Sequence, residues 1–141
     1  MDYINDIPPE IITKYNDHYI LAVIGSRSIT DKQLVFTNLK YIIDLLSVHK
    51  LITDNKLIIL SGKARGVDSF AMEYAKRHNI LNINILPNWN LLGKKAGFVR
   101  NENIIKYSHR IIAFQTENSA GTQNGIDHAK RMKKKINVVK L

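Results

Sequence analysis

The sequence contains no cysteine, which excludes disulfide bonds and thiolate metal sites. No apolar run approaches the roughly 20 residues that a helix needs to span a bilayer. The first six residues hold two acidic side chains and lack the basic, apolar pattern of a secretion signal. These absences predict an intracellular, cytoplasmic protein that is neither secreted nor embedded in a membrane.

Three common functional motifs are also missing. The five histidines are scattered without the spacing of HExxH, so we predict no metal site. The absence of GxxxxGK followed by serine or threonine excludes a P-loop ATPase. No GxGxxG follows the first predicted strand, so the usual dinucleotide fingerprint is absent.

Positive charge is in clear excess, with a formal net charge of +9 and a pI of about 9.8. Such a balance favours phosphorylated or polyanionic partners through long-range attraction. Part of it comes from one basic run over residues 130–135. The run fits either a solvated helix end, where cations complement the helix dipole, or a nucleic-acid patch. No aromatic residues interleave with it for base stacking.

The predicted strands are apolar throughout instead of alternating, which is typical of a parallel sheet buried on both faces. Helical patterns separate them, so we predict an α/β fold, a Rossmann-like three-layer sandwich with a mainly parallel five-stranded sheet. We expect an N-terminal arm over residues 1–18 and one nucleotide-binding domain over residues 19–141. The predicted strands are 19–24, 57–60, 80–86, 110–115 and 136–139, and the predicted helices are 9–15, 31–50, 67–78, 93–107 and 122–134.

Four polar or glycine-rich segments follow the predicted strands: 25–28, 61–66, 87–90 and 118–122. Because parallel strands end at one edge of a sheet, these segments are expected to lie on the same rim. Helix N-termini and glycine turns present backbone N–H groups to anions, and Lys63 and Arg65 add positive charge. The sequence therefore predicts a nucleotide or phosphate site at this edge.

Individual residues of that rim each have two interpretations. Arg27 and Arg100 bind phosphate, or they bond neighbouring carbonyls and surface acids. Asp68 accepts from ribose hydroxyls or orients an arginine, or it only stabilises a helix N-terminus. Trp89 stacks on a base or packs in the core. Asn101 reads a ribose or base edge, or caps local backbone.

Several blocks in this order resemble a known family. They are Gly25-Ser26-Arg27, the run from Ser61 to Asp68, the run from Pro87 to Asn101 with its AGxxRN block, and Ser119-x-Gly121-Thr122. Together they resemble the YspA-like, YpsA-related branch of the SLOG superfamily, which also contains the LOG ("Lonely Guy") phosphoribohydrolases and DprA. The resemblance covers the chain from about Ile20 to its end.

The resemblance implies a Rossmann-like fold and a pocket for a nucleotide or ADP-ribose-type ligand. Ser119 and Thr122 are also candidate caps of the last helix, and Gly66 also serves the backbone geometry of its turn. The predicted ligand-binding residues are Gly25, Ser26, Arg27, Ser61, Gly62, Lys63, Arg65, Gly66, Asp68, Trp89, Lys94, Gly97, Arg100, Asn101, Ser119, Gly121 and Thr122.

One departure bears on catalysis. LOG enzymes carry a glutamate where this sequence has Gly125, which leaves Asp68 as the candidate catalytic residue for cleaving an N-glycosidic bond. The first expectation is therefore a sensor or sequestering protein for an ADP-ribose, NAD-type or nucleoside phosphate ligand. The alternatives are a nucleoside-monophosphate phosphoribohydrolase and a DprA-like binder of single-stranded nucleic acid. Relatives often pair, so we expect a homodimer, with the helix over 31–50 as a candidate interface.

Overall fold

The computed structural model describes residues 3–4 and 14–141, so almost all of the predicted helix over residues 9–15 lies outside the described residues. One parallel sheet runs through the molecule in the order β1-β4-β3-β2-β5-β6. Its strands are β1 (Tyr3–Ile4), β2 (Tyr19–Gly25), β3 (Leu57–Ser61), β4 (Leu81–Ile85), β5 (Arg110–Gln115) and β6 (Lys135–Lys140). The helices are α2 (Lys32–Val48), α3 (Val67–Arg77), α4 (Trp89–Leu92), the 3-10 turn η1 (Gly93–Lys95), α5 (Ala96–Lys106) and α6 (Ala120–Arg131).

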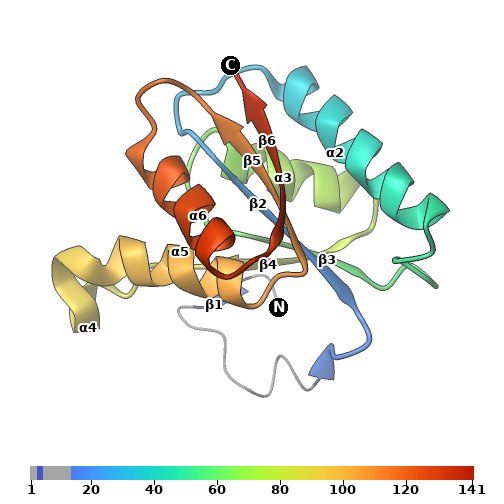
Figure 1. Cartoon of the computed structure of the whole chain (residues 1–141), viewed down its shortest axis with the longest axis horizontal. Helices are drawn as coiled ribbons and strands as arrows, with labels where there is room; N and C mark the ends of the chain where they lie inside the picture. The colour runs from blue at the N-terminus through green and yellow to red at the C-terminus, as the bar shows by residue number, and fades with distance from the viewer. Residues whose placement is uncertain (1–2, 5–13) are drawn as a thin grey trace.

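Helices cover both faces of the sheet, which gives the predicted three layers (Figure 1). On one face, α2 and α3 pack against alternate strand residues such as Leu21, Ile59 and Phe114. On the other face, α5 and α6 pack against the intervening residues, among them Ala22 and Leu60. Because β2, β3 and β5 are buried on both sides, their residues form nearly continuous apolar runs. The Rossmann-like prediction from this pattern is confirmed.

The sheet differs from the prediction at one edge. Its five longer strands are those the sequence predicts, but residues Tyr3 and Ile4 add a sixth, two-residue strand alongside Asn84 and Ile85 of β4. A strand of two residues has no periodicity, so the sequence gives no signal for it. It belongs to the segment predicted as an N-terminal arm.

The predicted helix over residues 93–107 is confirmed over Ala96–Lys106, but helical structure begins before it. The chain turns earlier, because the side chain of Asn88 caps α4 by accepting from the N–H of Leu91 at 3.1 Å. It then breaks at Gly93, whose φ of +58° lies in the left-handed region, before α5 begins at Ala96. Asn88 is the N-cap of α4, and it lies in the segment 87–90 that the sequence predicts as a loop. No helix among the described residues is long and apolar enough to cross a membrane.

Candidate anion-binding site

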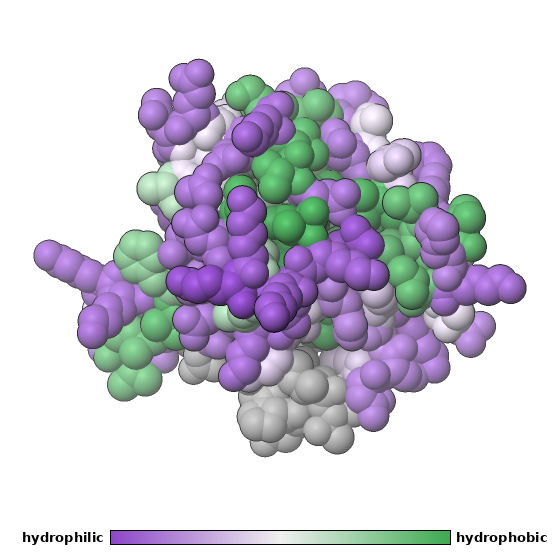
Figure 2. Space-filling model, viewed as in Figure 1, coloured by the Kyte–Doolittle hydropathy of each residue, from purple (hydrophilic) through white to green (hydrophobic). Residues whose placement is uncertain are grey.

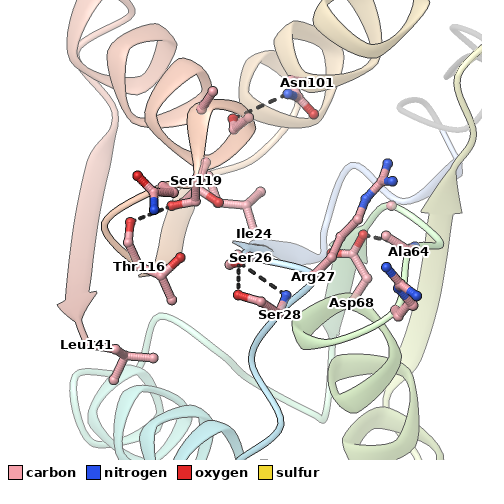
Figure 3. Close-up of a pocket in the computed structure, with 18 of the residues that line it drawn as sticks. Ile24, Ser26, Arg27, Ser28, Ala64, Asp68, Asn101, Thr116, Ser119 and Leu141 are labelled. Atoms are coloured by element: carbon pink, nitrogen blue, oxygen red, sulfur yellow. Dashed lines mark hydrogen bonds between the residues drawn. The ribbon is translucent and has the colours of Figure 1, made fainter.

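A large cavity lies where the strand order changes direction. From β2 the chain moves outward through β3 and β4, and then crosses back to β5 on the other side of β2. In such sheets the loops after the two central strands diverge and leave a crevice at their carboxyl ends. This crevice forms a cavity of about 900 Å³, a volume within the range of small-ligand pockets. Figure 3 shows Ser26 and Ser28 in its middle, between Asp68 on one side and Thr116 and Ser119 on the other.

Two glycines let the loops after β2 and β3 come together. A Cβ on Gly25 would lie 2.5 Å from a methyl of Val67, so the start of α3 packs directly on the end of β2. Gly66 has a φ of +72°, and a Cβ there would lie 2.7 Å from the carbonyl oxygens of Ser26 and Arg27. Side chains are thereby excluded from both positions. Gly66 serves loop packing, and it does not line the cavity.

Asp68 is buried in this cavity, with 8% of its surface exposed. One carboxylate oxygen accepts from the backbone N–H of Ala64 at 3.1 Å. Burial raises the pKa of Asp68, although that hydrogen bond, Arg100 and Arg27 each oppose the shift. The carboxylate thus fixes the turn after β3 and offers a desolvated hydrogen-bond acceptor to the cavity.

Arg100 reaches the same point from α5. Its Nε donates to the side-chain oxygen of Asn101 at 3.0 Å, and Nη1 donates to the carbonyl of Ile85 at 3.4 Å. Burial lowers the pKa of Arg100, and the neighbouring charge of Arg27 lowers it further. The carboxylate of Asp68 acts in the opposite direction and raises this pKa. An arginine keeps its charge under such shifts, so the cavity contains a partly desolvated cation.

Arg27 and Arg65 supply two further cations from different loops. Both line the cavity, and both side chains are exposed. Neither donates a hydrogen bond to any other residue in the described part of the chain. Beside Arg27, the hydroxyls of Ser26 and Ser28 lie 2.8 Å apart and close a local turn. The two guanidinium groups are therefore available to a ligand.

The N-terminus of α6 forms the opposite wall. Ser119 occupies the cap position, but its hydroxyl donates to the carbonyl of Thr116 at 2.8 Å, so the predicted side-chain cap is not made. The first turn carries no acidic residue. Asn101 ties this wall to α5 by donating to the carbonyl of Gly121 at 3.4 Å. The first N–H groups of α6 therefore face the cavity without a capping side chain.

A smaller cavity of about 300 Å³ adjoins the first. The two share Arg27, Ala64, Arg65 and Arg100 as lining residues. Trp89 borders the smaller cavity and is 57% exposed, so its alternative interpretation as a core residue is wrong.

The structure brings most of the predicted residues together. The larger cavity is lined by Gly25, Ser26, Arg27, Gly62, Arg65, Asp68, Arg100, Asn101, Ser119, Gly121 and Thr122. Lys63 and Trp89 line the smaller one. Four predicted residues line neither: Ser61, Gly66, Lys94 and Gly97. Ser61 is fully buried at the end of β3, and its hydroxyl has no hydrogen-bond partner.

Other lining residues were not predicted as ligand contacts: Ile24, Ser28, Ala64, Ile104, Thr116, Glu117, Asn118, Ala120, Gly125 and Leu141. Most of them adjoin predicted positions, and the rule that loops after parallel strands line the site would have included them. Ile104 and Leu141 carried no signal. Gly125, at the position of the LOG glutamate, packs on β2, since a Cβ there would lie 2.6 Å from the Cδ1 of Ile24.

The basic run over residues 130–135 lies at the opposite edge of the sheet. Helix α6 starts at the cavity and runs back along the strands, and Lys135 pairs with Arg110 at the beginning of β5. Lys134 donates to the carbonyls of Lys106 and Ser108 at 3.0 and 2.9 Å, which caps the end of α5. Lys134 therefore binds the end of a neighbouring helix, and not the end of α6 that the run follows.

Fold and site together define a Rossmann-like α/β domain whose arginine-rich cavity lies at the carboxyl edge of the sheet. Within that class the chain belongs to the DNA recombination-mediator protein A family, whose model matches residues 12–90, more than half of the sequence. This supports the relation to DprA within the SLOG superfamily that the sequence blocks indicate.

Two solved structures are similar to this one. The first is DNA processing protein A from Helicobacter pylori, described for its unique single-stranded DNA binding mode, with a TM-score of 0.65 and 24% identity over 89% of this chain and 67% of that one. The second is DprA from Streptococcus pneumoniae, with a TM-score of 0.52 and 18% identity over 89% of this chain and 60% of that one. At these identities the likeness concerns the fold. No curated protein matches the sequence.

Proposed function

We propose that this chain binds single-stranded DNA, with one nucleotide unit in the larger cavity and the neighbouring phosphates on its arginines. The observation that carries the proposal is the convergence of Arg27, Arg65 and Arg100, from three separate segments, on one cavity. The bare N-terminus of α6 adds a partial positive charge beside them. Family membership and the net charge of +9 support the same partner.

The test is the salt dependence of binding to a labelled oligothymidylate. For single strands each phosphate contact contributes about 0.7 to the slope of log affinity against log salt concentration. We expect Arg100→Gln and Arg27→Gln each to weaken binding and to reduce the slope by about that amount. Lys135→Gln, which removes one charge from the opposite edge of the sheet, is the matched control and leaves the slope unchanged.

The opposite pattern would overturn the proposed site. If Lys135→Gln and Lys133→Gln reduce the slope while the arginine variants do not, the strand binds the basic run instead of the cavity. If the wild-type chain shows no binding at low salt, the proposal fails as a whole.

A second candidate is a free nucleotide of the ADP-ribose, NAD or nucleoside phosphate type, which the chain senses or sequesters. The resemblance to the YspA-like branch supports this candidate, and so does the buried carboxylate of Asp68, an acceptor suited to ribose hydroxyls. Thermal-shift measurements with AMP, ADP-ribose and NAD test it. A ligand at 100 times its dissociation constant adds about 2.7 kcal/mol of stability.

Asp68→Asn separates the two candidates. A ribose ligand that donates to the carboxylate binds more weakly to the variant. A DNA strand binds equally well or more tightly, because the variant lacks a negative charge near its phosphates. Mass analysis of each nucleotide after incubation tests the phosphoribohydrolase alternative, in which Asp68 is the catalytic residue and the product is a free base.

A further inference from the structure

The smaller cavity combines an aromatic wall with several cations. Trp89, Pro87 and Leu86 form its apolar side, and Lys63 lies among its lining residues. Three arginines line it as well, and these are the same three that line the larger cavity: Arg27, Arg65 and Arg100. The two cavities therefore adjoin along a shared, positively charged wall at the rim of the sheet.

Trp89 is more exposed than is usual for a tryptophan, and packing in the core does not account for its position. It is the only tryptophan of the chain, and 57% of its surface is open. Asn88 caps the short helix α4, which begins at Trp89, and the edge of the ring lies over Gly97, 3.8 Å from where a Cβ would be. Leu91 and Phe98 on the neighbouring turns are also exposed, and Figure 2 shows hydrophobic surface at the lower left, where Figure 1 draws α4. An open aromatic ring beside cations is suited to a ligand with its own flat ring.

We propose that the smaller cavity is a second nucleotide subsite, where a base of the strand stacks on Trp89 while an adjacent nucleotide occupies the larger cavity. This inference rests on the proposed binding of single-stranded DNA. Aromatic rings that stack bases within a positively charged groove are the usual means of holding single strands without reading their sequence. The shared arginines lie between the two subsites, where the connecting phosphates of the strand would pass.

A protein partner fits this surface less well. The cores of protein interfaces are depleted in lysine, whereas Lys63 is among the residues that line this cavity. The dimensions also favour a nucleotide subsite, because about 300 Å³ lies at the lower end of the range for small-ligand pockets. The consequence is a preference for oligonucleotides over mononucleotides, since a single nucleotide cannot occupy both cavities at once.

Because Trp89 is the sole tryptophan, its fluorescence reports on this subsite alone. We expect titration with oligothymidylate to quench the emission of Trp89. Thymidine monophosphate, at equal occupancy of the larger cavity, should leave most of that emission unquenched. Trp89→Ala should weaken oligonucleotide binding by roughly 5- to 150-fold, the range for loss of one stacked base. Trp89→Phe should retain most of the affinity, because a phenyl ring still stacks. Tyr41→Ala, which removes an exposed ring from α2 on the other face of the sheet, is the matched control.

The outcomes are distinguishable. If oligothymidylate binds but neither quenches Trp89 nor loses affinity in Trp89→Ala, the second subsite is refuted and the proposed function stands. If Trp89→Phe is as weak as Trp89→Ala while both variants melt at the wild-type temperature, the ring does not act by stacking and the inference is again refuted. If no oligonucleotide binds the wild-type chain, the proposed function and the second subsite fail together.

Discussion

The guanidinium of Arg100 and the carboxylate of Asp68 lie against the same face of Gly62, one from α5 and the other from α3. A Cβ on Gly62 would be 2.5 Å from Nη1 of Arg100 and 2.8 Å from Oδ2 of Asp68. The missing side chain thus makes room for a cation and an acid side by side at the floor of the cavity. This arrangement leads to the first prediction.

Gly62→Ala should displace the end of the Arg100 side chain and weaken oligonucleotide binding. The fold should survive, since the atoms in the way belong to side chains and not to backbone. We expect an affinity loss comparable to that of Arg100→Gln, measured by fluorescence anisotropy, with an unchanged far-UV circular dichroism spectrum. Lys135→Gln, at the opposite edge of the sheet, is the control and should bind like wild type. Equal affinity of Gly62→Ala and wild type would show that the position of Arg100 is unimportant.

Gly66→Ala should destabilise the fold itself. Its φ of +72° disfavours any side chain, and the clashing atoms are the backbone carbonyls of Ser26 and Arg27, which cannot rotate away. A loss of about 1–3 kcal/mol in the free energy of unfolding is expected from the backbone strain. Urea denaturation measures it. Gly121→Ala, with nothing within 4 Å of its Cβ, should show no such loss, and equal midpoints for the two variants would contradict the prediction.

Asp68→Asn should stabilise the ligand-free protein near neutral pH. Burial raises the pKa of Asp68 above its usual 3.8, so the folded state disfavours the charged form. The stability linked to this group is complete below pH 3.8 and is lost as the pH rises through the raised folded pKa. The gain in melting temperature of the variant over wild type should therefore shrink as the pH falls toward the raised pKa of Asp68 in the folded state. A variant that melts below wild type near neutral pH would mean that the contacts of the carboxylate outweigh its burial.

His109 should make the fold sensitive to mild acid. Its Nδ1 accepts from the N–H of Ile20 at 2.9 Å, which requires a neutral ring, and its ring stacks on Tyr19. Burial lowers the pKa of His109 below 6.5, and Lys134 adds to this. The unfolded chain then takes up the proton first, so stability is complete above pH 6.5 and falls as the pH drops toward the folded pKa.

Melting curves across this range test the prediction for His109. Wild type should lose melting temperature below pH 6.5, and His109→Gln should lose less. His49→Gln, at an exposed position after α2, is the control and should follow wild type. Parallel curves for all three proteins would remove His109 as the source of the acid sensitivity.

The sequence by itself determined the layered fold and the edge of the sheet where the site lies. Apolar runs such as residues 57–60 and 110–115 can only be buried on both faces, which requires helices on each side. Glycine and basic residues directly after those runs are placed on one rim by the geometry of parallel strands. The residue types within each segment thus predict the fold class. The alternation of strands and helices along the chain predicts that the loops after the strands lie at one edge of the sheet.

Only the tertiary structure decided how those loops meet. The burial of Asp68 beside Arg100, the exposure of Trp89 and the pairing of β1 along β4 depend on contacts between distant segments. A single sequence does not show which distant segments lie close together, and residue type alone does not determine burial. Aspartate is usually found at the surface and tryptophan in the interior, but here Asp68 is buried and Trp89 is exposed. The basic run was likewise placed away from the cavity by the direction of α6, because a helix that follows a parallel strand must return to the opposite edge.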